Sequence, residues 1–443
     1  MAITEFLEVD LSPVLDESFA RETSEIGVAI DVNGETQLTH AGRKHGASKA
    51  NQRQHWTFEI GCIRHLFSAV IADRLAALNR INLDDFVARH VPALSDTPFG
   101  QSVQIRHLLS HSTGFIAPDA AGHPNVNDFT RDLRCARKMF PPGYYLLYTT
   151  RETLLLEEIL SRASGQSIGA LMNQFIFEVA QLRLRTVDAG TSWVASGFRA
   201  EDKDEEVSSR MCELCTFESY TLRISLTDLL QLCKGLLYHD PMATGSASLR
   251  DTLTSPVASL PNPISGTRIT EVPTAFGLGC GTFSSGLFGL NGATQGFCSG
   301  FRVYPQCNVA FAVALSDCNH IRRNKIIEAI QRQLPLPIPN REASINILID
   351  DVSVKSILGQ YCEAFKQTPQ RAHILQRSDA IVIVFKGEKM SSPDLTILRR
   401  NSDGIWQPAR AAKQISLRFF QIQGSPAIGI MVGLTILWRC NEQ

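Results

Sequence analysis

The sequence predicts an α/β fold in which helices flank an antiparallel sheet. A mainly helical lobe is inserted near residues 80–235, and a small antiparallel β domain follows at the C-terminal side. Three observations predict this arrangement. Strand patterns form a hairpin between Ile26 and His40 and return after Phe276, while helical periodicity dominates the residues between them. Three prolines between Leu334 and Pro339 then end the last helix, and alternating strand patterns follow.

The length and composition are those of a globular protein with more than one domain. The chain has 443 residues, 44% of them hydrophobic, and the proline run divides it into a domain over 1–337 and a smaller one over 338–443. Lys and Arg total 43 against 44 for Asp and Glu, so the net charge is −1. This balance argues against nucleic acid or an anionic membrane as a partner.

The expected compartment is the cytoplasm. No apolar run reaches the roughly 18 residues that span a bilayer. Residues 1–11 contain three acidic side chains and neither a basic nor an apolar signal region, so no secretory signal is expected there. The 11 cysteines, an odd number scattered along the chain, are then best interpreted as reduced thiols.

The N-terminal half contains three clear patterns. Ile26 to Asp31 and Glu35 to His40 flank Asn33-Gly34, a favoured two-residue hairpin turn. After Gly61, apolar residues recur at steps of three and four, which predicts a helix. A second helix is predicted over Thr150 to Ala163, ended by Ser164-Gly165.

The remaining patterns complete the sheet and the second domain. Ser225 to Leu237 predicts an amphipathic helix, and Ile321 to Gln333 predicts a terminal one. Short strands are expected at residues 279–283, 288–293, 300–304 and 309–316, and in the C-terminal domain at residues 381–385, 394–399, 414–421, 427–432 and 434–439.

Several short motifs occur in one order between roughly residues 20 and 335. They are Leu83-Asp84-Asp85, His111, Gly114, Pro142-Gly143, Tyr148, Gly292 and Gly296-Phe297. In these positions and their order the chain resembles the serine β-lactamase and penicillin-recognising family, in the branch that includes class C β-lactamases, esterases and fungal acyltransferases of secondary metabolism. The resemblance implies a β-lactamase-like fold with the active cleft between the sheet and the helical lobe.

The chain departs from this family at the reactive positions. Cys62 stands where the family has its nucleophilic serine, and His65 stands where it has the lysine base. Thr150 replaces the asparagine of the Tyr-x-Asn motif, and Leu290 replaces the histidine or lysine of the late strand. A leucine there removes charge and makes the cleft more apolar, which suits a hydrophobic ligand.

Cys62 and His65 are a chemically sensible replacement for serine and lysine. Cys62 lies at a predicted helix N-terminus, where the helix dipole and free N–H groups favour a thiolate. His65 follows three residues later, on the same face of the helix, and an imidazole can take the thiol proton. The resemblance implies an oxyanion hole formed by the backbone N–H groups of Cys62 and Ala293. Tyr148 is available as a proton shuttle.

The substrate-binding residues that follow from the resemblance are Thr150, Leu290, Asn291 and Gly292. Purely structural roles are an alternative for some of these residues. Cys62 can be inert packing, because free cysteine is among the most buried residue types. His65 can simply fill the space of a lysine, and His107 and His111 are expected to have structural roles in a turn after a helix.

Neither a metal nor a cofactor is expected. Cys212 and Cys215 have the spacing of half a zinc site, but no second pair at suitable spacing follows. The glycine-rich residues 277–281 and 286–292 lack the strand and helix context of a nucleotide-binding loop.

Three functional hypotheses remain open. The first is an enzyme of secondary metabolism that acts on a small carbonyl compound (ester-, thioester- or amide-like) by acyl transfer or hydrolysis through Cys62, with His65 as base and Tyr148 assisting. The second is a non-covalent isomerase or cyclase that uses His65 and Tyr148. The third is a catalytically inactive homologue that binds a ligand. The expected partner is a small-molecule substrate, with a carrier-bound acyl group as a further option, and the oligomeric state stays open.

Overall fold

The computed structural model describes about two thirds of the chain. The described residues are 9–13, 15, 25–41, 57–117, 126–180, 197–198, 206–207, 222–238, 249–259, 262–263, 275–283, 286–294, 296–334, 336, 355–362, 371–386, 395–400, 402, 406–408, 417–420, 429–432 and 435–439. Cys212 and Cys215 lie outside them. No helix in these ranges is both long and apolar enough to cross a membrane.

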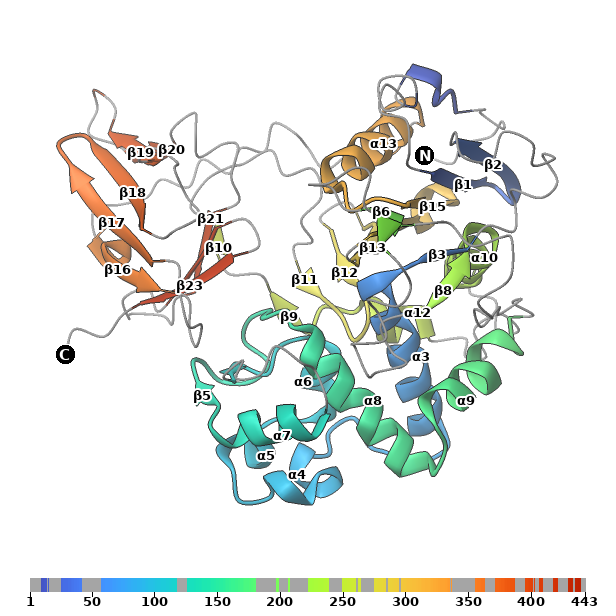
Figure 1. The fold of residues 1–443 in the computed structure, drawn as a ribbon, viewed down its shortest axis with the longest axis horizontal. Helices are drawn as coiled ribbons and strands as arrows, with labels where there is room; N and C mark the ends of the chain where they lie inside the picture. The colour runs from blue at the N-terminus through green and yellow to red at the C-terminus, as the bar shows by residue number, and fades with distance from the viewer. Residues whose placement is uncertain are drawn as a thin grey trace.

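An eight-stranded antiparallel sheet forms the centre of the larger part of the molecule (Figure 1). Its strand order is β2-β1-β15-β14-β13-β12-β11-β9, so the N-terminal hairpin pairs with the last strand of the region. The strands are β1 (Ile26–Val32), β2 (Glu35–Ala41), β9 (Ala258–Ser259), β11 (Ala275–Phe276), β12 (Gly281–Thr282), β13 (Phe288–Ala293), β14 (Cys298–Tyr304) and β15 (Val309–Leu315).

The predicted hairpin is confirmed, and its turn explains its register. Asn33 and Gly34 both have positive φ, 54° and 93°, as a two-residue hairpin turn requires. Every residue of β1 is buried, because both faces of the sheet are covered. Ile26, Val28, Ile30 and Val32 pack in one core cluster with α13 (His320–Gln333), whereas Ala29 packs in the other cluster with α10 (Leu226–Leu237).

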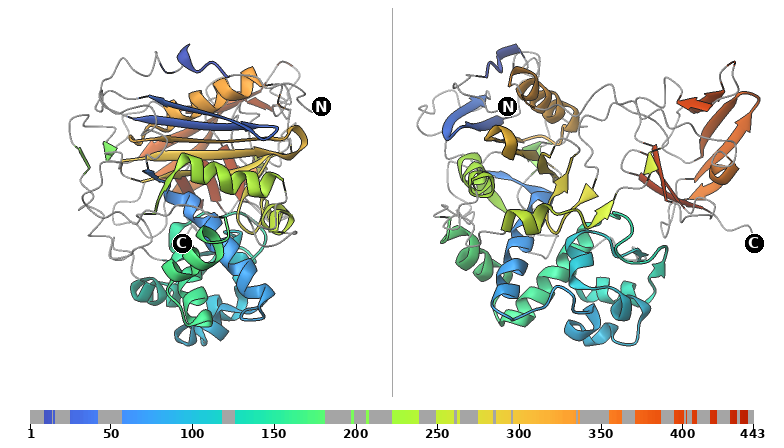
Figure 2. Two further views of the ribbon diagram at one scale, coloured as in Figure 1. Left: turned by 90° about the vertical axis from the view of Figure 1, so that its right-hand side faces the viewer. Right: turned by 180° about the vertical axis from the view of Figure 1, so that it is seen from behind.

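Helices cover both faces of this sheet (Figure 2). Helix α13 (His320–Gln333) packs on β14 and β15 from one side, and α10 (Leu226–Leu237) packs on β1, β14 and β15 from the other. Helices α3 (Arg64–Ala77) and α12 (Leu249–Thr254) contact each other beside α10. Short turns at η1 (Gly61–Ile63) and η5 (Pro305–Cys307) and a two-stranded pair, β3 (Thr57–Glu59) with β8 (Arg223–Ser225), complete this layer.

A helical lobe lies below the sheet in Figure 1. Its longest helix, α8, is the predicted one, and it ends at Gly165 in the left-handed conformation. The lobe contains α4 (Val87–His90), η2 (Pro92–Leu94), α5 (Pro98–Ser102), α6 (Ile105–Leu109), α7 (Val126–Arg134), α8 (Thr150–Ser164), α9 (Ile168–Met172), η3 (Asn173–Phe177) and the strand pair β4 (Phe115–Ile116) and β5 (Arg137–Lys138). A further pair, β6 (Gly197–Phe198) and β7 (Glu206–Val207), is isolated.

The C-terminal residues form a nine-stranded antiparallel sheet with the order β10-β21-β22-β23-β16-β17-β18-β19-β20. Its strands are β10 (Asn262–Pro263), β16 (Gly359–Cys362), β17 (Arg371–Arg377), β18 (Ala380–Lys386), β19 (Leu395–Arg400), β20 (Trp406–Pro408), β21 (Leu417–Phe420), β22 (Gly429–Val432) and β23 (Thr435–Arg439). The strands β16, β17 and β20 were not among the five predicted. The strand β10 comes from the larger domain, and a strand of two residues is too short to show a pattern in the sequence.

Candidate active site

Cys62 lies in a short 3-10 turn that precedes α3, rather than within the α-helix itself. Gly61 makes this turn possible, because its φ of +52° belongs to the left-handed region that glycine adopts without strain. The Cys62 side chain is half-buried and free of disulfide bonding, and its thiol has no hydrogen-bond partner among the described residues. The thiol is therefore available for chemistry at the start of a helix.

The turn at Gly61 packs directly against the end of β13. A Cβ at Gly61 would lie 2.6 Å from the backbone nitrogen of Ala293, and one at Gly292 would lie 1.8 Å from the carbonyl oxygen of Ile60. The Ser299 hydroxyl donates a hydrogen bond of 3.0 Å to the same Ile60 oxygen. The two glycines thus allow the backbones of Cys62 and Ala293, the residues expected to form an oxyanion hole, to come close together.

His65 is buried, with an exposed fraction of 1%, and both of its ring nitrogens have partners. Nε2 lies 2.7 Å from the carbonyl oxygen of Leu109, and Nδ1 lies 3.0 Å from the hydroxyl of Thr153. Because a carbonyl can only accept, Nε2 carries the proton and Nδ1 accepts from Thr153. Burial lowers the pKa of His65 from 6.5 to about 4, which keeps the ring neutral. In this structure its hydrogen bonds go to the helical lobe and not to Cys62.

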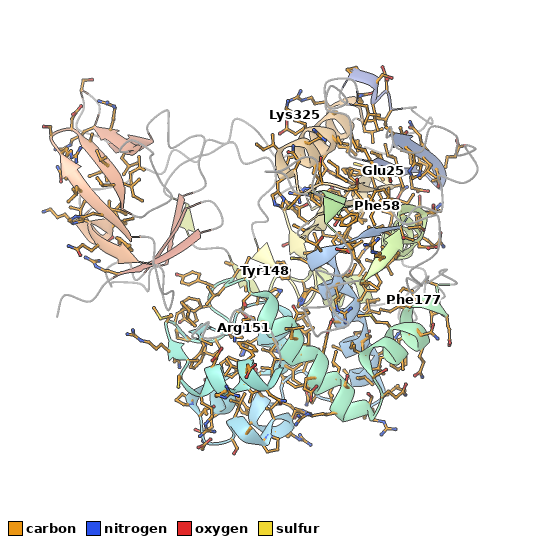
Figure 3. All side chains as sticks on the ribbon, in the orientation of Figure 1. Glu25, Phe58, Tyr148, Arg151, Phe177 and Lys325 are labelled. Atoms are coloured by element: carbon orange, nitrogen blue, oxygen red, sulfur yellow. The ribbon has the colours of Figure 1, made fainter. Side chains whose placement is uncertain are left out.

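Tyr148 lies just before α8, and 40% of its side chain is exposed. Figure 3 shows it close to the start of α8, where the helical lobe meets the sheet. Its ring lies 4.4 Å from that of His111, measured between centroids, and the His111 ring lies 4.2 Å from that of His65. The three rings form a continuous series of tilted contacts from the interior to the surface, so His111 links His65 to Tyr148.

The four expected substrate-binding residues occupy different environments. Thr150 is the first residue of α8, whose N-cap is Thr149. Leu290 is buried and belongs to the main core cluster, whereas Asn291 is half-buried and accepts a hydrogen bond of 3.0 Å from Arg302. Gly292 forms the close approach to Ile60 described above. Leu290 and Gly292 therefore share the face of β13 that packs toward the start of α3.

Two residues near the site had no functional assignment from the sequence. Glu152 is buried in the first turn of α8, and its Oε1 accepts a hydrogen bond of 2.5 Å from Thr113. Its Oε2 lies 3.6 Å from Nδ1 of His111. The sequence pattern that could have identified Glu152 is its spacing of three to seven residues from Leu155, Leu156 and Ile159, which places an acidic side chain on the buried face of the same helix. His111 was expected to be structural, and it does lie in the turn after α6.

Within the described ranges, no group of three or more His, Cys, Asp or Glu side chains is arranged to hold a metal ion. A Cys–His contact does occur outside the site, where Sγ of Cys318 lies 3.6 Å from Nε2 of His320. Burial and the neighbouring Asp317 raise the pKa of the Cys318 thiol. This thiol is therefore less suited to nucleophilic chemistry than an ordinary cysteine.

Comparisons with known proteins agree with the fold. The family described as "Beta-lactamase" matches residues 15–327, which is more than half of the chain. A β-lactamase of Pseudomonas fluorescens is 22% identical over 235 residues, which cover 52% of this chain and 63% of that protein. The matched region thus spans less than two thirds of that relative.

Solved structures extend the likeness to the second sheet. SurE in complex with D-Leu superposes with a TM-score of 0.67 at 18% identity, covering 97% of this chain and 98% of SurE. The octameric penicillin-binding protein homologue from Pyrococcus abyssi gives 0.60 at 17% identity, with 96% and 98% covered. A class C β-lactamase gives 0.59 at 18% identity, covering 75% of this chain and 99% of its own. The match over residues 15–327 shows that the chain belongs to the β-lactamase family.

Proposed function

We propose that this β-lactamase-fold protein is an enzyme that transfers or hydrolyses the acyl group of a small carbonyl compound through Cys62. The observation that carries the proposal is the position of the half-buried, unbonded thiol at a helix start, directly after Gly61, which packs against the backbone of Ala293. A nucleophile and two backbone donors are the minimum that acyl transfer requires.

The reaction proceeds in two steps that balance. In the first, His65 takes the Cys62 thiol proton as the sulfur attacks the carbonyl carbon, and the oxyanion accepts hydrogen bonds from the N–H groups of Cys62 and Ala293. Collapse breaks the bond to the leaving group, which takes a proton from Tyr148, and leaves a thioester on Cys62. In the second step, the Tyr148 phenolate takes the proton of water or an amine, which attacks the thioester, and the released sulfur regains its proton from His65.

The proposal assigns His65 as the base for Cys62, and this role requires a change in the hydrogen bonding of the ring. Its lone pair is on Nδ1, which accepts from Thr153. The ring can take the thiol proton only after it exchanges this hydrogen bond. The alternative within the proposal is that Tyr148, which is partly exposed, starts as the phenolate, takes the thiol proton and passes it to the leaving group.

The proposed substrates are small esters, thioesters or amides, including acyl groups on a carrier, and we place them in secondary metabolism. The buried Leu290, at the position where the family has a charged residue, favours an apolar acyl group. SurE was solved with D-Leu, so an amino acid is a reasonable acyl acceptor to include in a test panel.

Intact-mass measurement after incubation with aryl esters and N-acetylcysteamine thioesters of increasing chain length tests the proposal. We expect a mass increase equal to one acyl group, which disappears in Cys62→Ala and on addition of a competent acceptor. Cys135→Ala is the matched control, because Cys135 is an exposed thiol outside the site. A mass increase that persists in Cys62→Ala contradicts the assignment of Cys62 as nucleophile.

One observation favours a second candidate, an inactive ligand-binding homologue. Both His65 nitrogens already have partners inside the protein, as a purely structural histidine would. This candidate predicts that a compound of the panel raises the melting temperature, while neither an acyl adduct nor a product forms. Turnover that survives in Cys62→Ala but is lost in His65→Ala would instead support the non-covalent isomerase or cyclase.

A further inference from the structure

A buried pair of titratable side chains lies beneath Tyr148. His111 has an exposed fraction of 0% and Glu152 one of 2%. Nδ1 of His111 and Oε2 of Glu152 are 3.6 Å apart, and neither atom has a hydrogen-bond partner within the usual limits, nor does Nε2 of His111. Buried polar atoms without partners are rare, and each needs an explanation.

Burial disfavours charge on both members of the pair. It raises the pKa of Glu152 well above its ordinary value and lowers the pKa of His111 well below its own. Burial thus favours the protonated acid and the neutral imidazole. Oε1 of Glu152 accepts from Thr113 at 2.5 Å, so the acid proton belongs on Oε2, the oxygen that faces Nδ1 of His111.

His111 separates this acid from Tyr148. Its ring and the Tyr148 ring are 4.4 Å apart at 52°, and its carbonyl oxygen accepts a hydrogen bond of 2.6 Å from the N–H of Leu147. His111 therefore positions the segment that carries Tyr148 through the backbone and contacts the phenol ring with its side chain.

We propose that Glu152 and His111 are positioning residues that let Tyr148 ionise, by transferring the Glu152 proton to His111 when the phenolate forms. The role of Tyr148 rests on the proposed function. The transfer balances: Tyr148 gives its proton to the leaving group, Oε2 of Glu152 gives its proton to Nδ1 of His111, and the new imidazolium lies against the phenolate. When Tyr148 takes a proton from the incoming nucleophile, the Glu152 proton returns.

The groups around His111 are consistent with this role. His65, from α3, lies 4.2 Å away, is kept neutral by burial, and has both ring nitrogens bonded to Leu109 and Thr153, so it supplies no counter-charge to His111. Phe276, from β11, closes another side of His111 at 5.5 Å. The imidazolium is therefore unfavourable until a negative charge forms beside it, which couples its formation to ionisation of Tyr148.

The wild-type protein can be tested without a substrate. In protein labelled with 15N-histidine and 13Cζ-tyrosine, a pH titration followed by NMR reports both groups, with the variants Tyr148→Phe and His111→Gln assigning the signals. We expect the His111 ring to shift to imidazolium values at the same pH at which Tyr148 ionises, and to stay neutral at that pH in Tyr148→Phe. A His111 ring that stays neutral while Tyr148 ionises overturns the proposal.

A variant then tests the acid. Glu152→Gln keeps the shape and the acceptor for Thr113 but holds no transferable proton, so we expect the pKa of Tyr148 to rise by about one unit. His111→Gln should give the same rise, and the double variant should add nothing. Glu158→Gln is the control on the same helix, because Glu158 pairs with Arg162 on the other face and should leave Tyr148 unchanged. An unchanged Tyr148 in Glu152→Gln contradicts the proposal.

The two proposals fail separately. An acyl adduct on Cys62 together with an uncoupled His111 would leave the acyl-transfer proposal intact and remove the relay. A coupled titration without any acyl adduct would do the reverse, since the NMR titration reads ionisation and needs no turnover.

Discussion

At the residue scale, His65 shows how one environment sets the chemistry of a side chain. The position is three residues after Cys62, yet the ring nitrogens bond to a carbonyl of α6 and a hydroxyl of α8. Its complete burial makes the charged form unfavourable. A neutral ring with a fixed tautomer is a precise hydrogen-bonding link between three helices, and only its Nδ1 can act as a base.

The lowered pKa of His65 predicts a pH dependence of stability. Between pH 6.5 and about 4 the unfolded chain binds a proton at this position and the folded chain does not. The free energy of unfolding should therefore fall as the pH falls through this window, by at most about 3 kcal/mol from His65. Burial of His111 acts in the same direction, whereas the raised pKa of Glu152 opposes it, because the folded state binds that proton more tightly.

Urea unfolding at several pH values between 4 and 7.5 checks this prediction. The His65→Gln variant should lose much of the slope, since glutamine does not titrate in this range. A slope that is the same in the wild type and in His65→Gln would show that the ring does not remain neutral in the folded state.

At the element scale, α3 and α8 are held together by charge as well as by apolar packing. Arg64 at the start of α3 makes two hydrogen bonds, of 2.7 and 3.1 Å, to the Glu157 carboxylate on α8, and both side chains are buried. Ser68 adds a third, donating to Oε1 at 2.8 Å. Because α3 follows the Cys62 turn and α8 follows Tyr148, this pair fixes the spacing between the two halves of the site.

We therefore expect Glu157→Gln to destabilise the fold by about 3 kcal/mol, because it leaves the buried Arg64 guanidinium without a counter-charge. Glu158→Gln, one residue further on the same helix, breaks only a surface pair with Arg162 and should cost less than about 1 kcal/mol. Chemical denaturation of the two variants provides the comparison. Equal losses would mean that the Arg64–Glu157 pair is not buried as described.

At the scale of the whole molecule, the two sheets have separate cores. The two large hydrophobic clusters of the described residues extend from Val9 to Leu336, and the residues buried between Tyr361 and Leu398 belong to the nine-stranded sheet. Among the described residues, β10 follows β9 of the first sheet in the chain and pairs with β21 of the second. This pairing involves only two residues of each strand.

A chain that ends at residue 337 should for this reason fold by itself. Its core clusters remain complete, and the loss of β21 removes only the short pairing with β10. We expect a single cooperative thermal transition and a native-like near-ultraviolet circular dichroism spectrum. An aggregated or non-cooperative product would show that the nine-stranded sheet is needed for the first domain to fold.

The sequence by itself determined those features that depend on neighbouring residues. Asn33-Gly34 predicts a hairpin because its turn geometry is local, and the helix of residues 150–163 is visible from its apolar spacing and its terminal glycine. The ordered motifs around Cys62, Tyr148 and Gly292 likewise indicate the β-lactamase fold, which the family match and the structural neighbours confirm.

Only the tertiary structure decided where the side chains of the site point. The partners of His65 are 44 and 88 residues away in the chain, and Thr113 is 39 residues from Glu152. No periodicity or motif encodes such contacts, because a ring can turn toward either of its neighbours until the surrounding helices have packed. The ionisation states of His111 and Glu152 are likewise consequences of burial, and burial is a property of the folded molecule as a whole.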